Sequence, residues 1–206
     1  MSTRTQPYHH GDLRAALVEA ALVTTRSGGP TALSLREVTR TVGVSPAAAY
    51  RHFGDRSILL RAVAHEVQER MGTAMRRRMR APRDAAPDER ALRRLRGVGL
   101  GYVAFALEEP GWFETAFFGD AADRPADVPI SAPPPPFALL TAALDECVEA
   151  GALPAGRRED AEFACWAAVH GCAELLIHGP LRDAPPAMKR RVTERTVDDI
   201  IAGVRG

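Results

Sequence analysis

The segment GVSPAAAYRHFGDRS, residues 43–57, places several possible anion-binding groups on one short stretch of chain. The side chains of Tyr50 and His52 can donate hydrogen bonds to phosphate oxygens. Residues 46–48, Pro-Ala-Ala, are small and apolar, so the chain there can approach another surface closely. A short helix with a polar, aromatic end is a poor core element. The segment therefore predicts a partner outside the chain.

Local signals place these groups on two short helices. Ser34 and Glu37 have the spacing of a capping box, in which each side chain satisfies a free amide of the first helical turn. Gly43 can take the left-handed conformation that ends a helix. Ser45 then offers a second N-cap, and Pro46 suits the first helical position after it. Two short helices joined by a tight glycine turn are predicted to form a helix-turn-helix.

A helix-turn-helix places its second helix in the major groove of DNA. The carbons of residues 46–48 could then touch thymine methyl groups, while Tyr50 and His52 bind phosphates on the groove walls. Asp55 is expected to cap the next helix, and Arg56 in its first turn opposes the helix dipole unless a phosphate lies nearby. The alternative is a helical corner whose polar residues merely face water.

Residues 8–60 resemble the N-terminal domain of TetR/AcrR-type transcriptional regulators, over about a quarter of the chain. The resemblance implies that Arg36 reads a guanine. Thr39 stands where the family favours alanine, Ala49 where a larger apolar residue is common, and Arg56 where lysine is usual. The DNA-binding residues expected from the motif and the resemblance are Ser34, Arg36, Ser45, Pro46, Ala47, Ala48, Tyr50, Arg51, His52 and Arg56.

Apolar residues recur at helical spacing along the chain, and strand alternation is missing. We therefore expect an all-α protein with two parts. A three-helix helix-turn-helix DNA-binding domain is predicted over residues 1–57, and a larger helical domain for ligand binding and dimerisation over residues 58–206. Within the larger domain, the proline-rich residues 119–136 are predicted to form a mobile loop.

The net charge of +1 conceals a small asymmetry. Residues 1–56 contain seven arginines and four acidic residues, a difference of +3, which leaves −2 for the rest of the chain. A positive N-terminal part suits contact with a polyanion. The sequence has no apolar run of the roughly 18 residues that a membrane span needs, no signal-peptide pattern and no disulfide framework among its three cysteines. These features predict a cytoplasmic protein without membrane contact.

A lone domain of this kind makes too few contacts to select a unique DNA site, so we expect a homodimer on a partly palindromic operator. Residues 160–179 are apolar nearly all round and include small side chains that allow close helix approach. Residues 187–206 carry an apolar stripe. These last two helices are predicted to form a four-helix interface between two copies, as in the family. Alternatively, both belong only to the core of one chain.

Aromatic residues are frequent in the segment between the helix-turn-helix and the last two predicted helices, above all in GWFETAFF, residues 111–118. Such side chains suit a small, largely apolar effector. The residues predicted to line its site are Tyr102, Phe105, Trp112, Phe113, Phe117, Trp166 and His170. The run WAAVHG, residues 166–171, also resembles the Trp-His-Gly (WHG) signature of one branch of these regulators. Core packing is the alternative role for each aromatic residue, and a hydrogen bond to another helix is the alternative for His170.

Catalytic and metal-binding patterns fail on inspection. HEVQE, residues 65–69, lacks the second histidine of the zinc-protease motif, and GVGLGY, residues 97–102, lacks the preceding strand of a dinucleotide site. The glycines of the second run either weaken their helix or permit close packing. We expect no enzyme activity, no metal and no cofactor.

The favoured function is a dimeric repressor that a small, largely apolar effector releases from its operator. Two alternatives remain open. One is a regulator of the same fold that responds to a protein or to oxidation, and the other is a small helical enzyme that uses His170 or Cys165.

Overall fold

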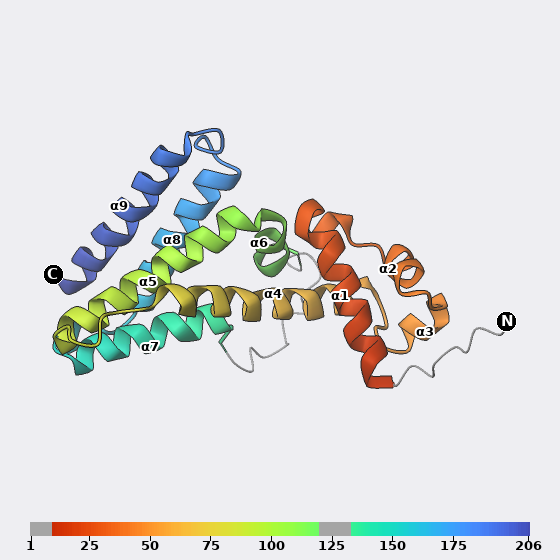
Figure 1. The fold of residues 1–206 in the computed structure, drawn as a ribbon, viewed down its shortest axis with the longest axis horizontal. Helices are drawn as coiled ribbons and strands as arrows, with labels where there is room; N and C mark the ends of the chain where they lie inside the picture. The colour runs from red at the N-terminus through yellow and green to blue at the C-terminus, as the bar shows by residue number, and fades with distance from the viewer. Residues whose placement is uncertain (1–9, 120–132) are drawn as a thin grey trace. The chain divides into compact units, whose positions relative to one another are not determined.

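The computed structural model describes residues 10–119 and 133–206. Within these ranges the chain forms nine α-helices, two short 3-10 helices and no strand, so the predicted all-α class is confirmed (Figure 1). None of the described helices is long and apolar enough to cross a lipid bilayer. The α-helices are α1 (His10–Gly28), α2 (Leu35–Val42), α3 (Pro46–Tyr50), α4 (Arg56–Arg78), α5 (Pro87–Glu108), α6 (Pro110–Phe117), α7 (Pro135–Glu149), α8 (Ala161–Ile177) and α9 (Pro186–Arg205). The 3-10 helices are η1 (Pro30–Ala32) and η2 (Ala155–Arg157).

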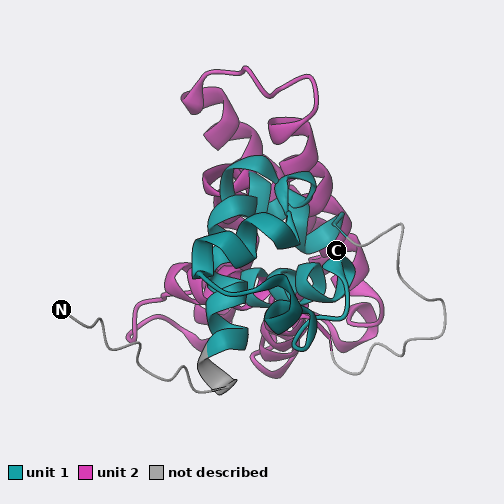
Figure 2. Cartoon of the chain, turned by 90° about the vertical axis from the view of Figure 1, so that its right-hand side faces the viewer, with its two compact units in different colours: residues 1–67, 111–128 teal, residues 68–110, 129–206 magenta. Residues whose placement is uncertain are grey.

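The chain divides into two compact units, which Figure 2 shows in different colours. The first unit contains residues 1–67 and 111–128, and the second contains residues 68–110 and 129–206. One division falls within α4 and the other at the start of α6. Nearly all of helix α6 therefore belongs to the same unit as the helix-turn-helix.

In the first unit, apolar residues from α1, α2 and the first half of α4 form a core beneath α3. Leu17, Phe53 and Leu59 are completely buried, and Val38 of α2 is 1% exposed. Phe53 turns inward, and the guanidinium of Arg14 lies over its ring, 5.1 Å from the centroid. This core fixes the two short helices that carry the predicted DNA contacts.

In the second unit, α5 packs against α7, α8 and α9, and α8 also packs against α9. The end of α4 lies tightly on α5, because a methyl group built at Gly101 would be only 2.8 Å from the Cα of Met75. A methyl group at Gly97 would be equally close to the Cα of Met79. Both glycines therefore permit close helix packing, which was one of the two roles considered for them.

The segment between α6 and α8 differs from the prediction at its boundaries. Helix α7 begins at Pro135, within the stretch predicted to be a loop, because proline is well tolerated in the first helical turn. The predicted loop over residues 119–136 is shortened accordingly at its C-terminal end. Its residues 120–132 lie outside the described residues. The aromatic run 111–118 is mostly helical and forms α6.

Candidate functional site

The turn between α2 and α3 has the geometry that the local signals predict. The hydroxyl of Ser34 accepts a hydrogen bond from the amide of Glu37 (3.4 Å), and that of Ser45 accepts one from the amide of Ala48 (3.2 Å). Gly43 lies in the left-handed region with φ of 77°, where a side chain would be strained. Both N-caps and the glycine turn are confirmed, so α2 and α3 form a helix-turn-helix.

Helix α3 presents its outer face to solvent. Ala49 is completely buried and holds the helix against the core, whereas Pro46 and Ala47 are exposed at its N-terminus. Tyr50 is 55% exposed and is followed by the exposed Arg51. Among the other predicted contacts, Ala48 and His52 are half-buried, and Arg36 of α2 is exposed. A small apolar tip followed by a phenol and a cation suits insertion into a DNA groove.

Arg56 also has a role within the first unit. Its Nε donates a hydrogen bond to the carbonyl of Leu33 (2.9 Å), and its Nη2 donates one to the carbonyl of Pro30. These bonds tie the start of α4 to the turn before α2. The preceding Asp55 caps α4, as predicted, by accepting a hydrogen bond from the amide of Ile58 (2.9 Å). This bond stabilises the carboxylate and lowers the pKa of Asp55.

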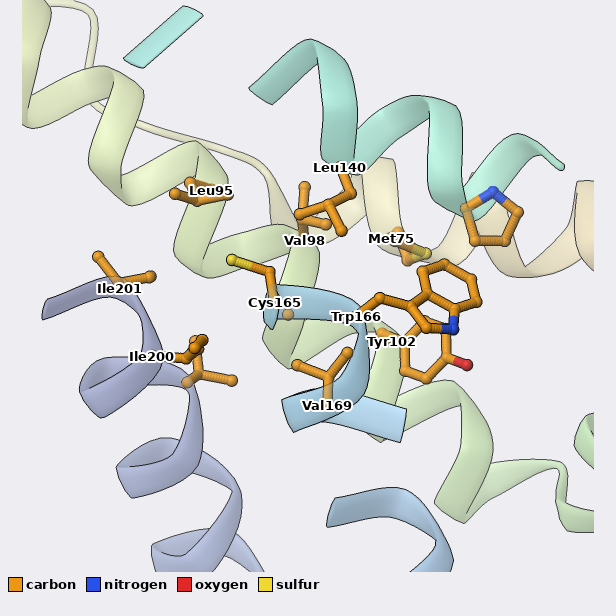
Figure 3. Close-up of a pocket in the computed structure, with 13 residues that line it drawn as sticks. Met75, Leu95, Val98, Tyr102, Leu140, Cys165, Trp166, Val169, Ile200 and Ile201 are labelled. Carbon is orange, nitrogen blue, oxygen red and sulfur yellow. The ribbon is translucent and has the colours of Figure 1, made fainter. Parts of the chain in front are cut away.

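The second unit contains an apolar cavity between α5, α7, α8, α9 and the end of α4 (Figure 3). Its volume is only about 20 Å³, room for about one water molecule. Among the described residues, none that lines it is charged. Its walls are Met75, Leu95, Val98, Gly99, Tyr102, Pro136, Leu140, Cys165, Trp166, Val169, Val197, Ile200 and Ile201. A ligand of ordinary size would have to displace some of these side chains.

Two aromatic rings close one end of this cavity, where Tyr102 and Trp166 lie side by side (Figure 3). Their centroids are 5.0 Å apart in an edge-to-face arrangement. The hydroxyl oxygen of Tyr102 lies 2.7 Å from Nδ1 of His170. Burial raises the pKa of Tyr102 and lowers that of His170, and Glu174 opposes the second shift. The two groups therefore form a neutral hydrogen-bonded pair at neutral pH.

A wider groove lies elsewhere on the second unit, between α5 and α9, with a volume of about 600 Å³. Its lining mixes apolar and charged residues. The charged residues of its lining are Arg78, Glu108, Lys189, Arg190 and Glu194. Charges of both signs make it a less suitable site for an apolar molecule than the apolar cavity.

One face of α8 is apolar and unburied within the single chain. Ala164, Ala167 and Gly171 are exposed along it, and Leu175 continues it with 47% exposure. Their spacing of three or four residues puts them on one side of the helix. A methyl group built at Gly171 would meet no atom within 4 Å. Such a strip of small residues allows another helix to approach closely.

Two family descriptions match the sequence. Residues 17–63 match "Bacterial regulatory proteins, tetR family", and residues 95–200 match "Tetracyclin repressor-like, C-terminal domain". The second match alone spans just over half of the 206 residues. The chain belongs to the TetR family of transcriptional regulators. Regulators of this family bind operator DNA, dimerise and respond to effector ligands. The WHG branch suggested by residues 166–171 remains a prediction within it.

Solved structures share the TetR-family fold. A protein of unknown function from Rhodococcus sp. RHA1 is similar with a TM-score of 0.70 and 29% identity, over 98% of this chain and 100% of that one. A TetR variant from Acinetobacter baumannii AYE, in complex with minocycline, has a TM-score of 0.61 and 19% identity, over 97% and 99% of the two chains. RolR in complex with resorcinol has a TM-score of 0.58 and 19% identity, over 95% and 92%. No curated protein was found to match the sequence.

The predicted ligand-binding residues of this TetR-family chain fall into three groups. Tyr102 and Trp166 line the cavity, and His170 bonds to the first of them. Phe105 is buried in α5 without reaching the cavity wall. The remaining three lie on α6 in the first unit, and they are Trp112, Phe113 and Phe117. The aromatic residues are thus divided between two cores.

Sequence reasoning missed most of the cavity wall. The additional lining residues are aliphatic or small, such as Val98, Leu140 and Val169, and α9 contributes Ile200 and Ile201. Their apolar helical periodicity identifies them as buried, but the same pattern describes every other core position. No signal in the sequence separates a residue beside a void from a residue in filled core.

The three cysteines, Cys147, Cys165 and Cys172, are all free and buried in the second unit. Burial raises the pKa of Cys147 and of Cys165 to about 11, and it also raises that of Cys172. Oxidation and nucleophilic attack both require the thiolate. These thiols therefore stay protonated and unreactive at neutral pH.

Proposed function

We propose that the protein is a dimeric repressor that holds its operator through α2 and α3 of two copies and releases it when a small, largely apolar effector binds. The observation that carries the DNA-binding part is the exposed outer face of α3, with its small tip and adjacent hydrogen-bond donors. Pro46, Ala47 and Ala48 would approach base edges, and Arg36 would read a guanine. The phosphate-binding set comprises Tyr50, Arg51, His52 and Arg56, supported by the caps of Ser34 and Ser45.

We propose that the protein divides by function at the domain boundary predicted from its sequence. Residues 1–57 carry the DNA contacts, and residues 58–206 contain the effector cavity and the self-association face. A two-fold dimer favours a partly palindromic operator, because each copy reads one half-site. Action on chromosomal DNA implies a cytoplasmic location.

Self-association through α8 and α9 is supported by the apolar face of α8. Ala164, Ala167, Gly171 and Leu175 would meet the same strip of a second copy, as a two-fold axis requires. Small residues let the two helices approach closely, and burial of the exposed Leu175 adds hydrophobic free energy. Helix α9 lies beside α8 and would complete the four-helix arrangement.

The effector site that we propose is the apolar cavity around Tyr102 and Trp166. Its apolar walls favour an uncharged molecule, since a buried charge there would have no partner. A ligand can release the operator only if it binds the released conformation more tightly. A tenfold loss of operator affinity requires about 1.4 kcal/mol of such coupling. The displacement of side chains needed to enter so narrow a cavity could supply that difference.

The first prediction separates phosphate contacts from base contacts. The probe is a duplex that the wild-type protein selects from a random-sequence pool. Tyr50→Ala is expected to weaken binding of selected and unselected duplexes equally, by about fivefold, because a phosphate carries no sequence information. Arg36→Ala is expected to reduce the preference for the selected duplex as well, by about 1–3 kcal/mol. Fluorescence anisotropy titrations measure both, and equal behaviour of the two variants would contradict the assigned docking.

The second prediction concerns the cavity. Toluene at ten times its dissociation constant is expected to stabilise the protein by about 1.4 kcal/mol, seen as a rise in melting temperature. Benzoate has the same ring with a carboxylate and is expected to give no shift, because the cavity cannot pair its charge. In Cys165→Phe, where the new ring fills the space, toluene should lose its effect while the selected duplex still binds. A toluene shift that persists in this variant would place the site elsewhere.

The alternative functions find less support. A redox-responsive regulator needs an accessible thiolate, whereas Cys165 and Cys147 are buried with raised pKa values. A helical enzyme that uses His170 would need a charged partner to orient and activate this histidine, whereas its Nδ1 is bonded to the neutral, buried phenol of Tyr102. We therefore favour regulation over catalysis.

A further inference from the structure

Helix α6 lies against the C-terminal half of α1, although the bonded residues are 90 positions apart in the chain. The indole Nε1 of Trp112 donates a hydrogen bond to the carbonyl of Leu22, 2.8 Å away. The guanidinium of Arg26 lies over the indole ring, 5.1 Å from its centroid. Trp112 is thus held to α1 by a directional bond and a cation–π contact in addition to its burial.

The backbone of α6 also comes close to α1. A methyl group built at Gly111 would lie 2.6 Å from the carbonyl oxygen of Thr25 and still closer to that of Arg26. Any side chain at this position would push the two helices apart. One turn further along α6, Glu114 lies beside Gly29, the residue that follows α1 with φ of 62°. Helix α6 therefore contacts both the last turn of α1 and the turn beyond it.

This turn leads directly into the helix-turn-helix. After Gly29 the chain forms η1, and Ser34 then caps α2. From the other side, Arg56 at the start of α4 donates to the carbonyls of Pro30 and Leu33. The connection between α1 and α2 is therefore held between α6 and α4. Its conformation sets the direction in which α2 leaves the core.

We propose that α6 is part of the DNA-binding unit and that Trp112 is a positioning residue for α2 and α3. Trp112 fixes the end of α1 and, through the turn at Gly29, the orientation of the two helices that meet DNA. The inference rests on the proposed DNA binding. It gives Trp112 a different role from the wall of an effector site, which its aromatic character alone suggests.

The test compares Trp112→Phe with Thr141→Val, which likewise removes one side-chain hydrogen bond to a backbone carbonyl, that of Phe137 in α7. Phenylalanine keeps an aromatic ring but cannot donate a hydrogen bond to Leu22. Trp112→Phe is expected to weaken binding of the selected duplex about fivefold, the order of one lost hydrogen bond. The slope of affinity against salt should stay the same, because the phosphate contacts remain. Thr141→Val, in the second unit, should leave the affinity within about twofold.

Two further readouts separate positioning from simple packing. In Trp112→Phe, amides of residues 29–36 should exchange hydrogen faster, while those of α5 and α8 keep their rates. In Trp166→Phe, Trp112 is the sole tryptophan, so its fluorescence emission should shift when the selected duplex binds. A residue that only fills space would show neither response.

Gly111→Ala provides a second variant that displaces α6 without altering Trp112, and it should weaken duplex binding as well. Gly156→Ala in η2 is its control, because a methyl group there meets no atom within 4 Å and η2 lies outside the proposed interfaces. Unchanged duplex affinity in both Trp112→Phe and Gly111→Ala would overturn the role of α6 and leave DNA binding intact. Failure of the wild-type protein to select any duplex would overturn both proposals.

Discussion

Replacing Ala47 with glutamate is expected to abolish operator binding while leaving the protein folded. Ala47 is exposed in the first turn of α3, directly after Pro46, where an acidic side chain is favourable for the helix dipole. In the proposed complex the same carboxylate would enter the major groove between two rows of phosphates. We expect the selected duplex to bind at least about 100-fold more weakly, or about 2.7 kcal/mol. Anisotropy titration measures the affinity, and thermal unfolding checks the fold.

The chain offers a matched control for this substitution. Ala187 occupies the corresponding place in α9, directly after Pro186, and is also exposed. Ala187→Glu changes the net charge by the same amount at the same helical position, but outside the DNA-binding unit. Its affinity for the duplex should stay close to that of the wild type. Normal binding by Ala47→Glu would mean that α3 does not enter the groove.

Replacing Ala167 with arginine should convert the protein into monomers. Ala167 lies at the middle of the apolar strip on α8, and a two-fold interface would bury the new charge twice. An unpaired buried charge costs about 3–5 kcal/mol. We expect the dimer to dissociate at least about 100-fold more readily, and duplex affinity to fall with it, because one copy reads only one half-site. Analytical ultracentrifugation measures the mass, and the anisotropy titration measures the affinity.

Ala142→Arg serves as the control for dimerisation. Ala142 is exposed on α7, outside the proposed interface, and arginine is a good helix former at either position. This variant should remain dimeric and should bind the duplex normally. A dimeric Ala167→Arg would show that another face of the second unit joins the copies.

The helix-turn-helix could be predicted closely because its signals are local. The caps at Ser34 and Ser45 and the turn at Gly43 each depend on residues within four positions of one another, and all three form as expected. The inward turn of Phe53 follows from the same register. Short-range rules of this kind do not require knowledge of the tertiary fold.

The role of α6 could not be predicted in this way. The hydrogen bond between Trp112 and Leu22 joins residues far apart in the chain. The spacing of apolar residues in the sequence does not predict a contact of this kind. The aromatic run of α6 looks the same whether it lines a ligand site or packs on another helix. The sequence therefore suggested one aromatic cluster, whereas Trp112 and Trp166 belong to different cores. For the same reason, aliphatic cavity residues such as Val98 could not be told from filled core.

The buried thiols of this regulator can report how often its second unit opens. All three cysteines lie in the second unit, and each is shielded from solvent in the native fold. Alkylating reagents can reach them only during rare openings of that unit, so the rate of modification measures how often such openings occur. A molecule that fills the cavity beside Cys165 is expected to slow the modification of the cysteines. Changes confined to the helix-turn-helix are expected to leave that rate unchanged. Alkylation of the wild-type protein, followed by mass spectrometry, therefore measures the rate at which the second unit opens.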